Sequence, residues 1–110
     1  MKVFFYETSG GNSPIKKFID GLPELDQARF FEVIAEIEKY GLGALRVIFK
    51  PLEGKLWEIK FRSVQSSFRV AYVILEKDTM TWLHVFKKKT QKTSRQDLEI
   101  ARKRMKEILS

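Results

Sequence analysis

Cysteine is absent from this 110-residue chain, which excludes disulfides, thiolate metal sites and cysteine nucleophiles. His84 is the only histidine, so a zinc site built from several imidazoles is not expected. No run approaches the roughly 18 apolar residues that a membrane-spanning helix requires. The first residues, MKVFFYETSGG, hold too short an apolar stretch for a signal peptide. We therefore expect a cytoplasmic protein without a metal, a cofactor or a membrane contact.

Apolar residues are plentiful, at 44% of the chain, and 13% of the residues are aromatic. A chain of this length suits one core, so we predict a single domain over residues 1–110. The net charge of +7 is unevenly distributed along the chain. Residues 1–54 carry seven Lys/Arg against eight Asp/Glu, whereas residues 55–110 carry fourteen against six. A basic half of a folded chain favours a surface for phosphates or an acidic partner, although many small basic proteins bind nothing specific.

The first half of the chain predicts one strand and two helices. Residues 2–7, KVFFYE, are aromatic and β-branched and precede a turn-forming cluster, which indicates a strand. Ser13-Pro14 is typical of a helix start, and that helix should stop near Gly21. A longer helix should begin around Pro23 and end at Gly41, because apolar residues recur between them at three- and four-residue steps.

The second half predicts three strands and a last helix. The strands, at residues 56–62, 68–76 and 81–87, have short connections and should form an antiparallel meander. Within residues 56–62 the apolar side chains alternate with charged ones, so one face should be apolar and the other charged. Thr93 or Ser94 can cap the last helix, and Asp97, three residues after Ser94, stands where a capping box has its acidic residue. The sequence thus predicts an α+β fold in which helices cover one face of a small antiparallel sheet, two of them N-terminal and one C-terminal.

Basic residues fall at the ends or edges of these strands: Arg62, Arg69, Lys87, Lys88 and Lys89. A twisted meander can bring them together although they are distant in sequence. Arginine binds phosphate oxygens in a planar, two-pronged way, and lysine adds a mobile charge. Such a site can cut RNA without metal, because the RNA 2′-hydroxyl supplies the nucleophile.

His84 is the candidate general acid or base, since its ordinary pKa lies near neutrality. A packing role is somewhat favoured over catalysis, because His84 alternates with Trp82 and Phe86 on the expected strand. The lysine run can also be a solvated strand end that discourages aggregation.

Four segments carry a resemblance to a known family: SPIKKFIDGL, LWEIKFR, SFRVAYVI and WLHVFKKKTQKTSRQDLEIARKRM. In this order they resemble the RelE/ParE toxin superfamily, and within it the phage-related HigB-like branch. The likeness covers nearly the full chain. It implies a RelE-like fold and a toxin encoded beside an antitoxin, often a helix-turn-helix DNA-binding protein. RelE- and HigB-like members cleave messenger RNA on the ribosome without metal, whereas ParE-like members inhibit DNA gyrase.

The resemblance implies roles for particular residues. We predict that Arg62, Arg69, Lys89 and His84 are catalytic, with the two arginines binding the scissile phosphate. Lys60, Lys87, Lys88, Lys92 and Arg95 are predicted to bind RNA. The expected partners are the antitoxin, messenger RNA and the ribosome.

One departure from the family keeps other functions open. Some members use a tyrosine or a second histidine near the C-terminus for proton transfer, and here no tyrosine follows Tyr72 and no histidine follows His84. The leading hypothesis is a ribosome-dependent endoribonuclease toxin. The alternatives are a gyrase inhibitor of the same fold and a partner-binding descendant that has lost catalysis.

Overall fold

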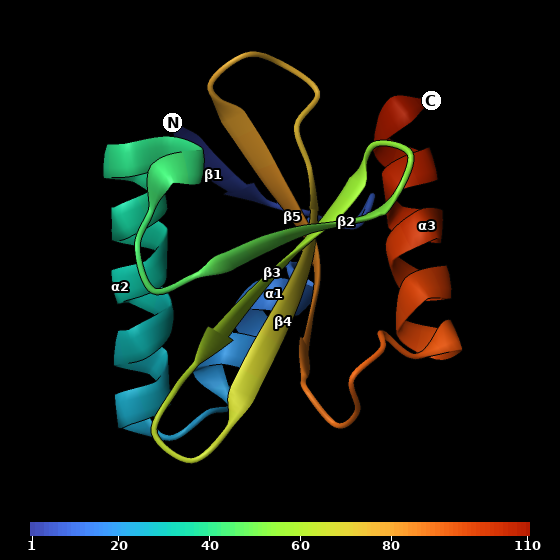
Figure 1. Ribbon diagram of the computed structural model, residues 1–110. Helices are drawn as coiled ribbons and strands as arrows, with labels where there is room; N and C mark the ends of the chain where they lie inside the picture. The colour runs from blue at the N-terminus through green and yellow to red at the C-terminus, as the bar shows by residue number, and fades with distance from the viewer.

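A computed structural model describes all of residues 1–110 and contains five strands and three α-helices (Figure 1). A single 3₁₀ turn, Gly41–Gly43, follows the second helix. In chain order the elements are β1 (Lys2–Phe5), α1 (Pro14–Asp20), α2 (Glu24–Tyr40), β2 (Ile48–Glu53), β3 (Leu56–Arg62), β4 (Ser67–Val73), β5 (Thr79–Lys87) and α3 (Arg95–Leu109).

The helix ends are determined by local chemistry that the sequence displayed. Ser13 Oγ accepts a hydrogen bond from Lys16 N at the start of α1, and Pro14 is the first helical residue. Gly41 follows α2 with a φ of 62°, a conformation that side chains with a Cβ rarely adopt. Ser94 Oγ accepts from Asp97 N, which confirms one of the two predicted caps of α3.

The sheet has the order β1-β5-β4-β3-β2 and is mixed. The meander of β3, β4 and β5 is antiparallel as predicted, but β1 pairs with β5 in parallel, so a purely antiparallel sheet was wrong. A strand that sequence analysis missed, β2, pairs antiparallel with β3 at the other edge. Its Pro51 has no N–H to donate to a sheet ladder, and proline is tolerated there because β2 is an edge strand.

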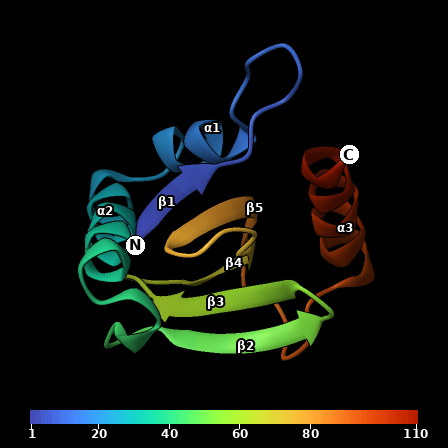
Figure 2. The ribbon, with the colours of Figure 1, turned by 90° about the horizontal axis from the view of Figure 1, so that it is seen from above.

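The helices lie on both faces of the sheet, which corrects the expectation that all of them cover one face (Figures 1 and 2). On one face, Phe30 of α2 packs edge-on against Phe61 and Phe68. On the other face α3 contacts β5, β4 and β3, and its Ala101 is fully buried. The reason is visible in β4, whose apolar side chains point to both faces and therefore need cover on both.

Two side-chain placements differ from the expected pattern, the first in burial and the second in the face of the sheet. On β3, Glu58 is buried with 2% of its surface exposed, whereas Trp57 is 38% exposed. On β5, an irregularity opposite Ala71 and Tyr72 places Trp82 on a different face from His84. Trp82 packs against Phe30, while the His84 ring stacks on Phe86, with 5.1 Å between the ring centroids.

None of the three α-helices has both the length and the apolar character of a membrane-spanning helix.

Candidate functional site

Most of the predicted basic residues lie near one end of the sheet, where β3 and β5 end and β4 begins. Arg62 pairs with Ser67 across β3 and β4, and Lys88 N donates to Ser67 O at 2.8 Å. The segment between β5 and α3, residues 88–94, leaves the sheet at the same end (Figure 1). A cavity of about 600 Å³ opens between this segment, the first turn of α3 and the C-terminal part of α1.

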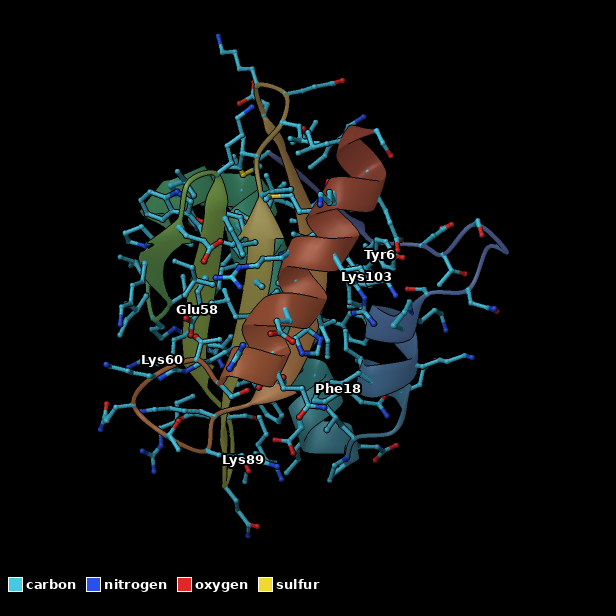
Figure 3. All side chains as sticks on the ribbon, turned by 90° about the vertical axis from the view of Figure 1, so that its right-hand side faces the viewer. Tyr6, Phe18, Glu58, Lys60, Lys89 and Lys103 are labelled. Atoms are coloured by element: carbon cyan, nitrogen blue, oxygen red, sulfur yellow. The ribbon has the colours of Figure 1, made fainter.

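Six of the nine predicted site residues line this cavity: Arg69, His84, Lys87, Lys88, Lys89 and Lys92. Lys60 and Arg62 instead line a neighbouring groove with Arg46 and Ser67. Arg95 is exposed on α3 and forms an ion pair with Glu99. In Figure 3, Lys89 lies at the lower end of the molecule and Lys60 on the flank of β3. The structure thus brings the β5–α3 residues together and separates Lys60, Arg62 and Arg95 from them. Their predicted roles stay predictions.

Arg69 is the most deeply buried of these residues, with 4% of its side chain exposed, and its donors are engaged inside the protein. Its terminal nitrogens donate to the backbone oxygens of Thr90 and Gln91 and to Thr93 Oγ1. Arg69 Nε lies 3.0 Å from Glu58 Oε1, although its hydrogen does not point along that contact, so the pair is ionic rather than a well-aligned hydrogen bond.

Thr93 closes this buried network, because its hydroxyl donates to Glu58 Oε2 at 2.8 Å while accepting from Arg69. Glu58, Arg69 and Thr93 therefore form a ring of polar contacts that fixes the far end of the lysine-bearing segment. A buried charge pair of this kind is tolerated because the terminal nitrogens of Arg69 and the second oxygen of Glu58 have hydrogen-bond partners, and only Arg69 Nε relies on the ionic contact alone. In this arrangement Arg69 anchors residues 90–93, the stretch that follows Lys87, Lys88 and Lys89.

His84 is oriented by Asp97 of α3. The His84 Nε2 and Asp97 Oδ1 atoms are 2.7 Å apart, and the other Asp97 oxygen accepts from Ser94 Oγ at 2.7 Å. An ionised carboxylate only accepts, so Nε2 carries the proton and Nδ1 is the acceptor of the neutral ring. Burial lowers the pKa of His84, while the hydrogen bond to Asp97 raises it and the charge of Arg104 lowers it. The net pKa is below the ordinary value of 6.5, which keeps His84 neutral at pH 7.

The four cavity lysines are free of acidic partners. None of Lys87, Lys88, Lys89 and Lys92 forms an ion pair, and Asp97 is the one acidic residue that lines the cavity. On its other side the same segment borders a shallow polar groove with Gln65, Ser66 and Ser67. Positive charge is therefore presented to solvent on both sides of residues 87–89, as an anion-binding surface requires.

Sequence analysis missed Glu58 and Asp97 as site residues and also Phe18, which lines the cavity from α1. Asp97 was identified only as part of a helix cap. Asp97 contacts His84 because α3 crosses the end of β5. The local sequence pattern does not predict that crossing. Glu58 stood on the charged face of a predicted strand, and its burial requires the pairing with β4 and the cover of Thr93.

Tyr72 is no alternative proton donor here, because burial raises its pKa to about 12 and it lines a different groove.

A mixed five-stranded sheet with two helices on one face and a third on the other defines an α+β protein of RelE-like fold. The model of the phage-derived Gp49-like family (DUF891) matches residues 17–106, and the chain belongs to that family. Its members share the RelE/ParE-like toxin fold. No match was found among curated proteins. Assignment to the HigB-like branch stays a prediction.

Proposed function

We propose that this protein is the toxin of a type II toxin–antitoxin pair and cleaves messenger RNA on the ribosome without a metal. Family membership supports the toxin assignment. The observation that carries the chemistry is the cavity itself, which is lined both by four unpaired lysines and by a neutral histidine held by a carboxylate. These are the groups that transesterification at an RNA phosphate requires.

The proposed reaction uses the 2′-hydroxyl of the nucleotide before the scissile phosphate. His84 Nδ1 takes the proton of that hydroxyl as its oxygen forms a bond to phosphorus. The bond from phosphorus to the 5′ oxygen breaks, and this departing oxygen receives a proton from a cavity ammonium group, for which Lys89 is the candidate. The remaining lysines stabilise the negative charge that develops on the phosphate oxygens.

The arginines have other roles in this proposal than the phosphate binding expected from the sequence. Arg69 is a positioning residue, because its guanidinium is committed to Glu58 and to the 90–93 backbone. Lys60 and Arg62 lie in the adjoining groove, where they extend the basic surface along which RNA is guided. Phosphate binding in the cavity falls mainly to the lysines.

The antitoxin is the expected protein partner. An acidic, partly disordered segment that folds across the lysine-bearing end of the sheet would neutralise it and exclude RNA. The complex should then weaken as salt is raised, and a complex that is insensitive to salt with its lysines still reactive toward acylating reagents would contradict this mode of inhibition.

The decisive experiment is induced expression of the wild type and of a Lys88→Gln/Lys89→Gln variant in bacteria. We expect the wild type to stop growth and to produce new 5′ ends within translated messages, and the variant to lose both effects. Lys77→Gln is the matched control, since Lys77 is exposed in the β4–β5 connection at the opposite end of the sheet (Figure 1).

Ribosome dependence is tested by incubating the purified protein with a message alone and with a message in a stalled ribosome complex. Cleavage only in the second sample is the expected result. Growth arrest with intact messages would contradict the nuclease proposal, and inhibition of gyrase supercoiling by the same protein would then replace it.

A further inference from the structure

We propose that the cavity takes up one unpaired ribonucleotide and that Phe18 and Leu22 form an apolar wall that binds its base. This inference rests on the proposed function and extends it by naming the substrate class, which is single-stranded RNA with one base out of its stack. The wall faces the segment that carries Lys87, Lys88 and Lys89 across the cavity.

Phe18 is a partly exposed aromatic whose orientation is fixed by the core behind it. Its ring makes edge-on contacts with Phe30 and Phe68, with centroid distances of 6.4 and 6.1 Å. A ring that is already packed against two others loses less conformational entropy than a free side chain when a base stacks on it. Figure 3 shows Phe18 on the α1 side of α3, above Lys89 in that view.

Leu22 completes the wall from the connection between α1 and α2, and two hydrogen bonds hold its backbone in place. Leu22 N donates to Ile19 O at 3.0 Å, and Leu22 O accepts from Gln27 Nε2 at 2.9 Å. The wall is therefore a preformed surface, which favours binding because little ordering is needed.

The combination of an aromatic wall with unpaired lysines on the facing segment matches the way that proteins bind single strands. Basic groups follow the backbone, and successive or isolated bases stack on aromatic rings. At about 600 Å³ the cavity suits one small organic ligand rather than a duplex. Bases within a duplex are stacked and paired, so a base reaches the wall only from a single strand or after it has been turned out.

The test uses RNA oligonucleotides that contain 2-aminopurine, a base whose fluorescence falls when it stacks on an aromatic ring. Purified wild-type protein should bind the single-stranded oligonucleotide with quenching and should bind the matched duplex more weakly. Phe18→Leu keeps an apolar side chain but removes the ring, and we expect it to weaken single-strand binding about fivefold or more and to abolish the quenching. Phe18→Tyr keeps the ring and should behave as the wild type.

Two controls separate the base-binding wall from other effects. Phe31→Leu removes an exposed aromatic of α2 outside the cavity and should change nothing. Thermal unfolding of each variant shows whether the fold is retained. If Phe18→Leu is unfolded, Leu22→Gln, which makes the other half of the wall polar, takes its place: weaker single-strand binding supports the wall, and wild-type binding overturns it.

The outcomes distinguish this inference from the proposed function. If Lys88→Gln/Lys89→Gln abolishes RNA binding while Phe18→Leu binds and quenches as the wild type does, the base-binding wall is overturned and the nuclease proposal stands. If the wild type binds no RNA, free or in a ribosome complex, the proposed function fails first. If Phe18→Leu loses only the affinity for an acidic antitoxin peptide, the wall belongs to the protein partner and the inference is overturned.

Discussion

His84 is held neutral by its surroundings, and this has a consequence for stability as well as for catalysis. Burial is the largest influence on its pKa, which lies below the ordinary 6.5 in the folded chain. As the pH falls, His84 therefore becomes protonated in the unfolded chain at a higher pH than in the folded chain. Its protonation thus favours unfolding. The stabilising contribution of neutral His84 is fully present above about pH 6.5 and is lost as the pH falls through the lower, folded-state pKa.

We predict that the free energy of unfolding of the wild type declines as the pH falls below about 6.5 and that His84→Gln removes this part of the decline. Glutamine can still donate to Asp97 but does not titrate. Urea denaturation at a series of pH values measures the effect. An identical pH dependence for both proteins would show that His84 is not buried in its neutral form. In a cleavage assay the acid limb of kcat/KM should likewise lie below pH 6.5, because the proposed base must be unprotonated.

The segment between β5 and α3 is an element without regular secondary structure, and a buried network positions it. Thr90, Gln91 and Thr93 are all bound by the single guanidinium of Arg69. Loss of this side chain would free the segment and leave the Glu58 carboxylate buried without its partner.

We predict that Arg69→Ala lowers the free energy of unfolding by about 3–5 kcal/mol, as expected when one partner of a buried ion pair is removed. Urea denaturation measures the loss, and backbone amide exchange in residues 88–93 should accelerate. The double variant Glu58→Leu/Arg69→Met is the control and should lose less, because no unpaired charge is buried. Equal stability of Arg69→Ala and the wild type would mean that the network contributes nothing. A loss of toxicity in Arg69→Ala is therefore no proof of phosphate contact.

Among the elements, those with a chemical signal at their ends were predictable and those that depend on a neighbour were not. Ser13-Pro14, Gly41 and Ser94 mark helix ends through their own backbone preferences, and all three were predicted. The strand β2 contains Pro51 and has mostly exposed side chains, so it lacks the alternating pattern of a half-buried strand. The parallel pairing of β1 with β5 joins segments far apart in sequence, and no local pattern encodes it.

The residues of the candidate site can also be divided into those that the sequence predicted and those whose position depends on the fold. Lys87, Lys88, Lys89 and Lys92 are close in sequence, so their convergence on one cavity required no knowledge of the fold. Arg62 reached the same end of the sheet through strand register, but it stands on β3, with β4 between it and β5, and it lines the next groove. The burial of Arg69 depends on Glu58 and Thr93, which come from two other segments.

At the scale of the whole molecule, the excess of positive charge in residues 55–110 predicts RNA binding that is strongly dependent on salt. Each phosphate neutralised on a single strand contributes about −0.7 to the slope of log affinity against log salt. We predict that Lys89→Gln makes this slope shallower by about 0.7, whereas Lys77→Gln leaves it unchanged. Fluorescence anisotropy of a labelled oligonucleotide over a range of salt concentrations measures both slopes. A slope that is the same for the two variants would remove Lys89 from the RNA contact.

The two edges of the sheet are protected against pairing with another chain in different ways. At the β1 edge, the Glu38 carboxylate of α2 accepts the outward N–H of Val3, and Glu38 O accepts from the N-terminal amine. At the β2 edge, Pro51 interrupts the row of donors and Lys50 adds a charge. Copies that crowd together on one RNA, as the proposed function allows, would therefore meet without an open strand edge through which they could polymerise.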